Sequence, residues 1–202
     1  GGGVGLMVKL TKNELKKQKD ALKRFQRYLP TLQLKKQQLQ MVIRQVEQEH
    51  QNLVHEKERL RRDLMQWIGV FNDGIDLTPY VEIERLRTST GNIAGIDIPV
   101  FEELRFADTR WDLVGMPPWV DGGVEALRSV LRLDAQLKVL KEQLRLLGDE
   151  LRVTTQRVNL FEKVKIPETK ENIRMIRIYL GDQQTAAVVR GKIAKRNLTK
   201  AS

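Results

Sequence analysis

The chain contains no cysteine and only two histidines among its 202 residues. The first absence excludes a disulfide scaffold and a thiolate-based zinc or redox site, and the second excludes a metal centre built from several histidines. No apolar run approaches the roughly 20 residues of a membrane-spanning helix, and we expect no secretory signal. Aromatic residues make up only 5% of the chain, whereas charged residues make up 31%. This composition favours long helices and coiled coil over a thick globular core.

Positive charge is in excess but unevenly distributed. The chain has 36 Lys and Arg against 26 Asp and Glu, a net charge of +10. Residues 9–36 carry a net charge of +8 and residues 185–202 carry +5, whereas residues 73–123 carry −6. Solvated helix surface is the simpler explanation of any one charge run. Two basic termini around an acidic middle nevertheless require an anionic partner to be considered.

Apolar residues recur at alternating steps of three and four between residues 11 and 71, and 13 of the 17 resulting positions are apolar. A period of 3.5 held over this length is typical of a coiled coil, so we predict an N-terminal coiled-coil helix over residues 7–72. Thr11 and Glu14 predict a capping box at its start. Among the polar exceptions, His50 is expected to be a core histidine with a local partner, while Lys36 and Lys57 are expected to extend to water. The 17 positions are Leu15, Gln18, Leu22, Phe25, Leu29, Leu32, Lys36, Leu39, Ile43, Val46, His50, Leu53, Lys57, Leu60, Leu64, Trp67 and Phe71.

A second heptad pattern predicts a C-terminal coiled-coil helix over residues 124–198, followed by a disordered tail at residues 199–202. Its apolar positions shift by one residue near Pro167, which changes a supercoil locally without ending the helix. Prolines inside a helix are expected to kink it. If the two helices pair as an antiparallel hairpin with the second beginning near residue 124, Pro30 lies opposite Pro167.

The middle segment, residues 73–123, has a different pattern. Alternating residues predict a β-hairpin at about 80–99, with its turn around Gly91-Asn92 and with Pro99 ending the second strand. Residues 101–123, which include Trp111 and Trp119, are expected to form an irregular connector. Residues 1–6 are expected to be a cloning scar outside the fold. The predicted fold is therefore mainly α, a long antiparallel two-helix coiled coil of the N- and C-terminal helices with a small hairpin-containing middle segment.

No catalytic, cofactor-binding or metal site can be assembled from these residues. Gly122-Gly123 lacks the following Gly-Lys-Ser/Thr of a phosphate-binding loop. Paired carboxylates such as Glu102-Glu103 are more simply explained as a solvated strand edge. His50 and His55 both fall in the middle of the N-terminal helix, so no serine has a plausible histidine relay. We expect a non-catalytic chain without a cofactor.

Four motifs resemble those of one family, the D subunit of the V-type (vacuolar and archaeal-type) rotary ATPases, and together they cover residues 7 to about 198. The sequence departs from the family pattern at three positions: Leu10 replaces the proline that opens the first motif, Lys36 replaces an arginine in the second, and Pro30 falls where the family has an uninterrupted helix. The motifs are Thr11-Lys12-x-x-Leu15, Leu32-x-x-Lys35-Lys36-x-x-Leu39, Asn92-Ile93-Ala94-Gly95-Ile96-Asp97-Ile98-Pro99, and Arg157-Val158-Asn159 followed by Ile166-Pro167.

The resemblance implies a rotor: a non-catalytic central shaft that couples ATP hydrolysis or synthesis to rotation of a membrane ion-translocating ring. Its partners would be the catalytic and non-catalytic subunits of the ATPase hexamer, the small F subunit of the central stalk, and the funnel-shaped C/d subunit that links to the ring. The resemblance implies a cytoplasmic protein, peripheral to the membrane within the soluble ATPase sector, with no span of its own and no nucleic acid bound.

Two sets of residues are expected to meet partners, basic residues near the ends and apolar residues of the hairpin. A basic coiled-coil arm that binds nucleic acid is the first alternative function, but few aromatic residues interleave with the cations for stacking. A homodimeric scaffold is the second, and a hairpin between the helices makes it awkward. The expected partner residues are Lys12, Lys16, Lys19, Lys192 and Lys195, and Val81, Ile83, Ile96 and Ile98.

Overall fold

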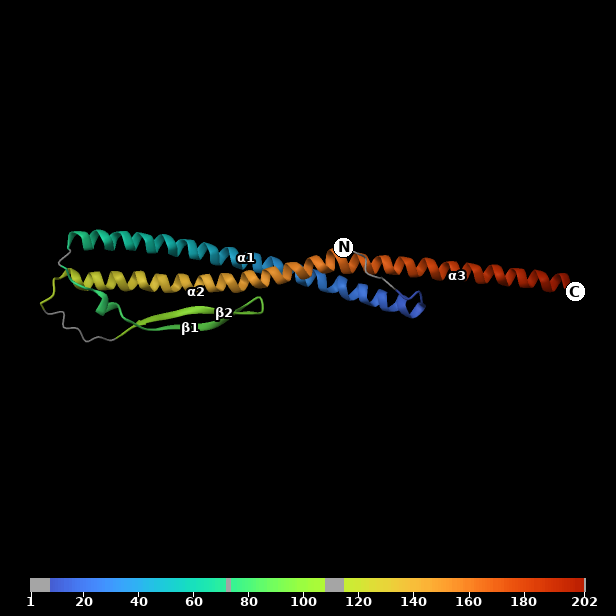
Figure 1. Ribbon diagram of the computed structural model, residues 1–202, viewed down its shortest axis with the longest axis horizontal. Coiled ribbons are helices and arrows are strands. Elements are labelled where there is room, and N and C mark those ends of the chain that lie inside the picture. The colour runs from blue at the N-terminus through green and yellow to red at the C-terminus, as the bar shows by residue number, and fades with distance from the viewer. Residues whose placement is uncertain (1–7, 72–73, 108–114, 202) are drawn as a thin grey trace. The chain divides into compact units, whose positions relative to one another are not determined.

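The computed structural model describes residues 8–71, 74–107 and 115–201 and is mainly helical (Figure 1). It confirms the predicted class, with long N- and C-terminal helices that pack together and a small antiparallel hairpin in the middle. Residues 1–6, the expected scar, lie outside the described residues. The elements in chain order are helix α1 (Lys12–Val70), the 3-10 turn η1 (Thr78–Val81), strands β1 (Ile83–Ile93) and β2 (Ile96–Phe106), helix α2 (Trp119–Leu160), the π-helical segment η2 (Phe161–Lys165) and helix α3 (Ile166–Ala201).

The chain divides into two compact units. The terminal unit consists of Gly1–Lys35 and Thr154–Ser202, and the middle unit consists of Lys36–Val153. Helix α1 contributes its first half to the terminal unit and its second half to the middle unit.

The start of α1 follows the predicted cap in part. The Glu14 backbone N–H donates to Oγ1 of Thr11 at 3.1 Å, as an N-cap threonine requires. The carboxylate of Glu14 accepts instead from Nε2 of Gln18 at 3.0 Å, one turn later. The helix then continues through Pro30 to Val70, so this proline does not end it.

Helices α1 and α3 pack antiparallel in the terminal unit. The Phe25 ring lies 5.4 Å from that of Phe161, and Asn172 donates to Gln18 at 3.4 Å. Because later residues of α3 meet earlier residues of α1, the two chains run in opposite directions. Buried residues of this unit include Val158 near the end of α2 and Thr169, Ile173 and Ile176 on α3.

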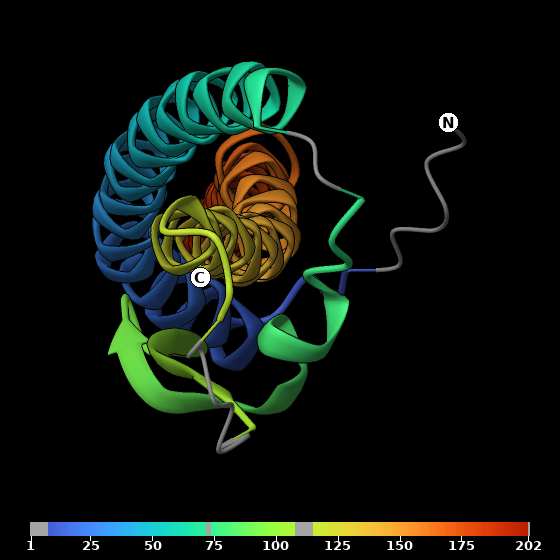
Figure 2. The same cartoon turned by 90° about the vertical axis from the view of Figure 1, so that its left-hand side faces the viewer.

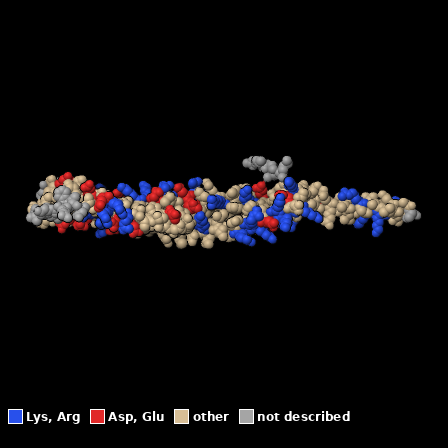
Figure 3. Space-filling model, turned by 90° about the horizontal axis from the view of Figure 1, so that it is seen from below, with Lys and Arg blue, Asp and Glu red and all other residues tan. Residues whose placement is uncertain are grey.

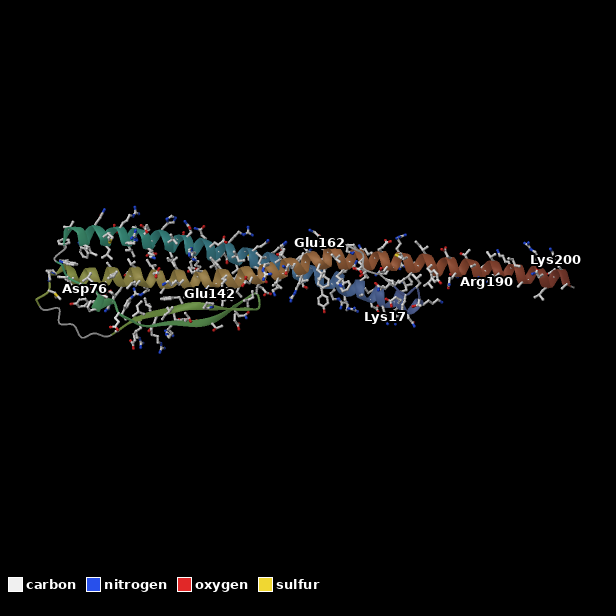
Figure 4. All side chains as sticks on the ribbon, viewed as in Figure 1. Lys17, Asp76, Glu142, Glu162, Arg190 and Lys200 are labelled. Atoms are coloured by element: carbon white, nitrogen blue, oxygen red, sulfur yellow. The ribbon has the colours of Figure 1, made fainter. Side chains whose placement is uncertain are left out.

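The last turns of α3 differ from the expected disordered tail. The helix continues to Ala201, and every described residue after Leu180 is exposed. Arg190 and Lys200, labelled in Figure 4, lie on this stretch. The tail predicted at residues 199–202 is therefore helical up to Ala201, and Ser202 lies outside the described residues.

The one-residue shift in the apolar pattern coincides with η2. A π-helical turn holds one residue more than an α-helical turn, so every apolar position after it moves by one. The backbone N–H of Ile166 reaches back to the carbonyl of Phe161, and Oγ1 of Thr169 donates to the carbonyl of Lys165 at 2.6 Å. Pro167, which has no N–H to donate, is the second residue after this segment.

The two prolines do not lie at the same level, and that prediction was wrong. Tyr28 lies 6.4 Å from Phe161 between ring centroids. In an antiparallel pair Pro167 therefore lies beside the part of α1 that precedes Tyr28, whereas Pro30 follows Tyr28. The error comes from the start of α2, which begins at Trp119 instead of near residue 124. Gly122 and Gly123 are thus helical, and the whole register moves by several residues.

In the middle unit, α2 lies between α1 and the hairpin (Figures 1 and 2). A core of buried apolar side chains holds the three together: Leu39 and Val46 from α1, Leu140 and Leu147 from α2, and Ile98 from β2. A second cluster, Leu77, Tyr80, Val120 and Val124, packs η1 and the segment before it against the start of α2.

The hairpin is present but longer than predicted, and its turn lies elsewhere. Ala94 and Gly95 have φ of 52° and 81°, which is the two-residue turn with left-handed backbone at both positions. Strand β2 continues through Pro99, which pairs with Thr90, to Phe106. Each strand of a two-stranded sheet has a free edge, where a residue without an N–H is tolerated. The expected connector is thus strand at residues 101–106 and helix from Trp119, while Trp111 lies outside the described residues.

Candidate interaction surfaces

The carboxylates singled out from the sequence, Glu102 and Glu103, form hydrogen bonds and ion pairs within the hairpin. Glu102 accepts from Oγ of Ser89 at 2.6 Å, and Glu103 pairs with Arg87 at 3.4 Å and with Arg105 at 3.2 Å. Within residues 8–71, 74–107 and 115–201, no group of three or more His, Asp or Glu side chains could hold a metal ion.

Most of the perturbed titratable groups lie in local ion pairs; the exception is Asp76, whose pKa is lowered by hydrogen bonds from Thr78. The pKa of Asp134 is lowered chiefly by Nζ of Lys57, which donates at 2.8 Å, and burial partly opposes this effect. Lys138 adds a second contact to Asp134 at 3.2 Å. Lys57 was expected to extend to water, and instead ties α1 to α2. His50 is half-buried on α1.

The two units carry opposite net charge. The terminal unit has 20 Lys and Arg and 6 Asp and Glu, a net charge of +14, whereas the middle unit has 16 and 20, a net charge of −4. The five basic residues predicted as partner contacts all belong to the terminal unit, and all are exposed. They are Lys12, Lys16 and Lys19 on α1 and Lys192 and Lys195 on α3. Figure 3 shows Lys and Arg gathered along the N-terminal part of α1.

The terminal unit also holds a groove between α1 and α3 with a volume of about 590 Å³. Of the predicted residues only Lys19 lines it. Four further cations were missed: Lys23, Lys170, Arg174 and Arg177. Their signal was present in the sequence, because they recur at steps of three and four beside the apolar positions of each helix. That these two rows would enclose a groove depends on the pairing of the helices.

The hairpin residues predicted as partner contacts divide into two groups. Ile83 is 49% exposed and Val81 is half-buried, so both present surface. Ile98 is only 2% exposed and belongs to the core of the middle unit, and Ile96 packs against the same core. The expectation is corrected for Ile98, whose side chain faces α1 and α2 instead of an open edge.

Two polar side chains of α2 bind the hairpin and the η1 turn that precedes it. Arg128 donates to the carbonyl of Tyr80 from Nε at 3.1 Å and from Nη2 at 2.9 Å, and lies 5.0 Å from the Phe106 ring centroid. The buried side chain of Gln143 donates to the carbonyl of Pro99 at 2.6 Å. The hairpin is thereby fixed to α2 near both its open end and its centre.

An apolar surface lies near the end of the α1–α2 pair in the middle unit. Trp67 packs edge-on against Phe71 at 6.0 Å, and Phe71 stacks on Trp119 at 6.4 Å. A groove of about 460 Å³ beside them is lined mainly by apolar residues, among them Leu60 and Val70. Val70 is 75% exposed and lies beside the partly exposed rings of Trp67 and Phe71, so the apolar side chains form a patch instead of a single exposed residue.

Comparison with known proteins agrees with the resemblance seen in the motifs. Across the described residues, no helix combines the length and apolarity needed to span a membrane. The family model of the ATP synthase D subunit matches residues 14–196. The V-type ATP synthase D subunit of Borreliella burgdorferi is 52% identical over 193 residues, covering 96% of each chain. That of Chlamydia pneumoniae is 33% identical over 207 residues, covering 96% of this chain and 95% of the relative, and that of Chlamydia abortus is 33% identical over 194 residues, covering 95% and 93%. The chain belongs to the ATP synthase D subunit family.

Proposed function

We propose that this chain is the central shaft of a V-type rotary ATPase. It couples ATP hydrolysis or synthesis in a hexamer of catalytic and non-catalytic subunits to rotation of the membrane ion-translocating ring. The chain contributes no catalysis of its own and lies on the cytoplasmic side, peripheral to the membrane.

The observation that carries this proposal is the continuity of α1. One helix, Lys12–Val70, takes part in both compact units, packing on α3 in the terminal unit and on α2 in the middle unit. A continuous helix carries its backbone hydrogen bonds from one unit into the other, and Pro30 removes only one of them, so twist applied to one unit passes to the other without crossing a loop. This is what a shaft between a motor and a load requires.

The terminal unit is the part that enters the hexamer. A two-helix pair presents unlike surfaces on its sides, so each surrounding catalytic site meets a different face of it. A contact that favours one nucleotide state over another couples rotation to the occupancy of the site, because differential contact energy is what shifts such an equilibrium. Its net charge of +14 favours association with anionic partner surfaces.

The middle unit is the part that meets the remaining central partners. Its exposed apolar residues near Phe71 and the outer face of the hairpin offer surface to the small F subunit and to the funnel-shaped C/d subunit. Arg128 and Gln143 hold the hairpin on α2, so a partner bound to the hairpin is carried with the helices.

A photo-crosslinking experiment tests the proposal. The chain has no cysteine, so a single substitution, Lys163→Cys in the terminal unit, accepts a benzophenone maleimide at one place. The labelled chain is assembled with the hexamer and irradiated during ATP hydrolysis. A shaft must turn, so turnover is expected to fall in proportion to the fraction of chain joined to the hexamer, while the labelled but unirradiated complex keeps full activity.

Two results would contradict the shaft. High crosslinking yield with unchanged turnover would mean that the chain is a static component. Failure of the chain to co-purify with the hexamer, together with salt-dependent binding to nucleic acid, would favour the basic-arm alternative instead.

A further inference from the structure

We propose that the groove between α1 and α3 is the docking site for an acidic amphipathic segment of one of the hexamer's subunits. This inference rests on the proposed shaft function and names the partner chemistry of its terminal unit. The groove is lined by Lys19, Leu22, Lys23 and Gln26 from α1 and by Lys170, Ile173, Arg174, Arg177 and Ile178 from α3.

The lining residues form one face of each helix. On α1 they follow steps of three, one and three residues, and on α3 steps of three, one, three and one. Such spacing places side chains on one side of a helix over about two turns, or roughly 10 Å. The groove is thus long enough for two turns of a partner helix laid along it.

The rims of the groove are cationic on both sides. Five of its nine lining residues are Lys or Arg, and none is acidic. Of these five cations, Arg174 alone has an ion-pair partner among the described residues, because Glu171 accepts from its Nε at 2.9 Å. Asp20 and Glu168 lie nearby in the sequence but do not line the groove. A segment that brings its own carboxylates supplies the missing partners.

The floor of the groove is apolar and partly uncovered. Ile173 is only 6% exposed, but Ile178 is 50% exposed between the cations of α3. A polypeptide with carboxylates on its sides and an apolar side chain between them would pair the cations and cover Ile178 together. A phosphate polymer would neutralise the rims but leave Ile178 in water, and none of the nine described lining residues is aromatic and able to stack on a base. The combination favours an acidic peptide segment over nucleic acid.

The position of the groove makes contact with the hexamer depend on the angle of the shaft. The groove lies on one side of a two-helix pair, so it faces only one part of a surrounding ring at a time. A contact that forms at one angular position and breaks at another gives the coupling described above a definite place on the molecule.

Binding kinetics of the full chain to immobilised hexamer test the proposal. The groove variant carries Lys19→Glu, Lys23→Glu and Lys170→Glu. The matched control carries Arg157→Glu, Lys163→Glu and Lys165→Glu, which make the same charge change at exposed positions of the same unit outside the groove. A third variant, Ile178→Gln, removes apolar surface without changing charge. Far-UV circular dichroism checks that every variant keeps its helicity.

The groove variant is expected to associate roughly tenfold more slowly than the control at about 50 mM salt, with the difference shrinking at about 300 mM as screening increases. Ile178→Gln is expected to dissociate roughly three to ten times faster, because the surface it would bury is lost.

Equal slowing by the groove variant and its control would show general attraction and overturn the groove while the shaft stands. An unchanged dissociation rate for Ile178→Gln would overturn the apolar part of the proposal. Groove-dependent binding of an RNA of about 20 nucleotides, as tight as that of the hexamer, would assign the groove to nucleic acid and overturn it. If the unmodified chain does not bind the hexamer at all, the shaft function fails, and the groove fails with it.

Discussion

Two glycines of α2 should respond in opposite ways to the same substitution. A Cβ built on Gly122 would lie 2.6 Å from Cη2 and 3.0 Å from Cζ3 of Trp67, whereas one built on Gly148 would meet no atom of the described residues within 4 Å. Alanine in place of glycine within a helix contributes up to about 1 kcal/mol. At Gly122 this gain is opposed by displacement of Trp67, and overpacking of this kind costs about 1–3 kcal/mol. Gly148→Ala is therefore expected to stabilise the chain by about 0.5–1 kcal/mol and Gly122→Ala to destabilise it by up to about 2 kcal/mol.

Urea unfolding followed by circular dichroism measures both changes, and the two variants serve as controls for each other. A second control is Trp67→Leu in the Gly122→Ala background. The shorter side chain removes the clash, so in the Trp67→Leu background alanine at 122 should no longer destabilise. The packing argument would be refuted if Gly122→Ala stabilised the chain as much as Gly148→Ala does.

Three further outcomes are expected from the buried and paired residues. Leu147→Ala should cost about 2.5–5 kcal/mol of unfolding free energy, because Leu147 is fully buried. Leu160→Ala, at a 43% exposed position, is the control and should cost under about 1 kcal/mol. Equal losses in urea unfolding would contradict the core assignment. Thr154→Val should be neutral or stabilising by up to about 1 kcal/mol, because Oγ1 of Thr154 is buried and has no hydrogen-bond partner among the described residues; a loss above that size would mean that the hydroxyl is bonded. The lowered pKa of Asp134 makes its pairing with Lys57 stabilising above the ordinary carboxyl pKa of about 3.9, and this contribution is lost as pH falls through the lowered value. Asp134→Asn should remove that part of the acid dependence in pH-resolved unfolding, at a cost under about 1 kcal/mol at neutral pH because the pair is about one-third exposed; an unchanged pH profile would refute the assignment.

Heptad spacing was sufficient to predict the long helices and a one-residue phase shift near Pro167, because burial on a helix depends on local periodicity; the π-helical form of that shift was not predicted. The one-residue shift near Pro167 marks the extra residue of η2. The pairing of the helices was not predictable in the same way. It depends on where α2 begins, and Trp119 begins that helix while stacking on Phe71, a contact between residues far apart in sequence.

The hairpin shows the same division between local and tertiary information. Turn chemistry occurs at Gly91-Asn92 and again at Ala94-Gly95, and local propensity does not choose between them. A different turn would change the strand register, and a shift by one residue moves every side chain to the opposite face. In the register set by Ala94-Gly95, Ile98 pairs with Gly91 and is buried against the helices, a contact that local propensity does not contain.

The basic surface was predictable as an excess of charge but not as a shape. Lys12, Lys16, Lys19, Lys192 and Lys195 were selected because they lie near the chain ends, and they are indeed exposed. The groove that unites Lys23 with Arg177 requires the two helices to be set side by side at one register. Charge counts along a single helix do not contain that information.

The most direct test of the central claim is to observe rotation. Glu56→Cys places a single thiol on an exposed position of α1 in the middle unit, and a bead attached there reports the motion of the chain while the hexamer is fixed to a surface. We predict stepwise, unidirectional rotation of the bead when ATP is supplied and none with a non-hydrolysable analogue. ATP turnover by the same complexes with a bead that stays still would contradict the shaft.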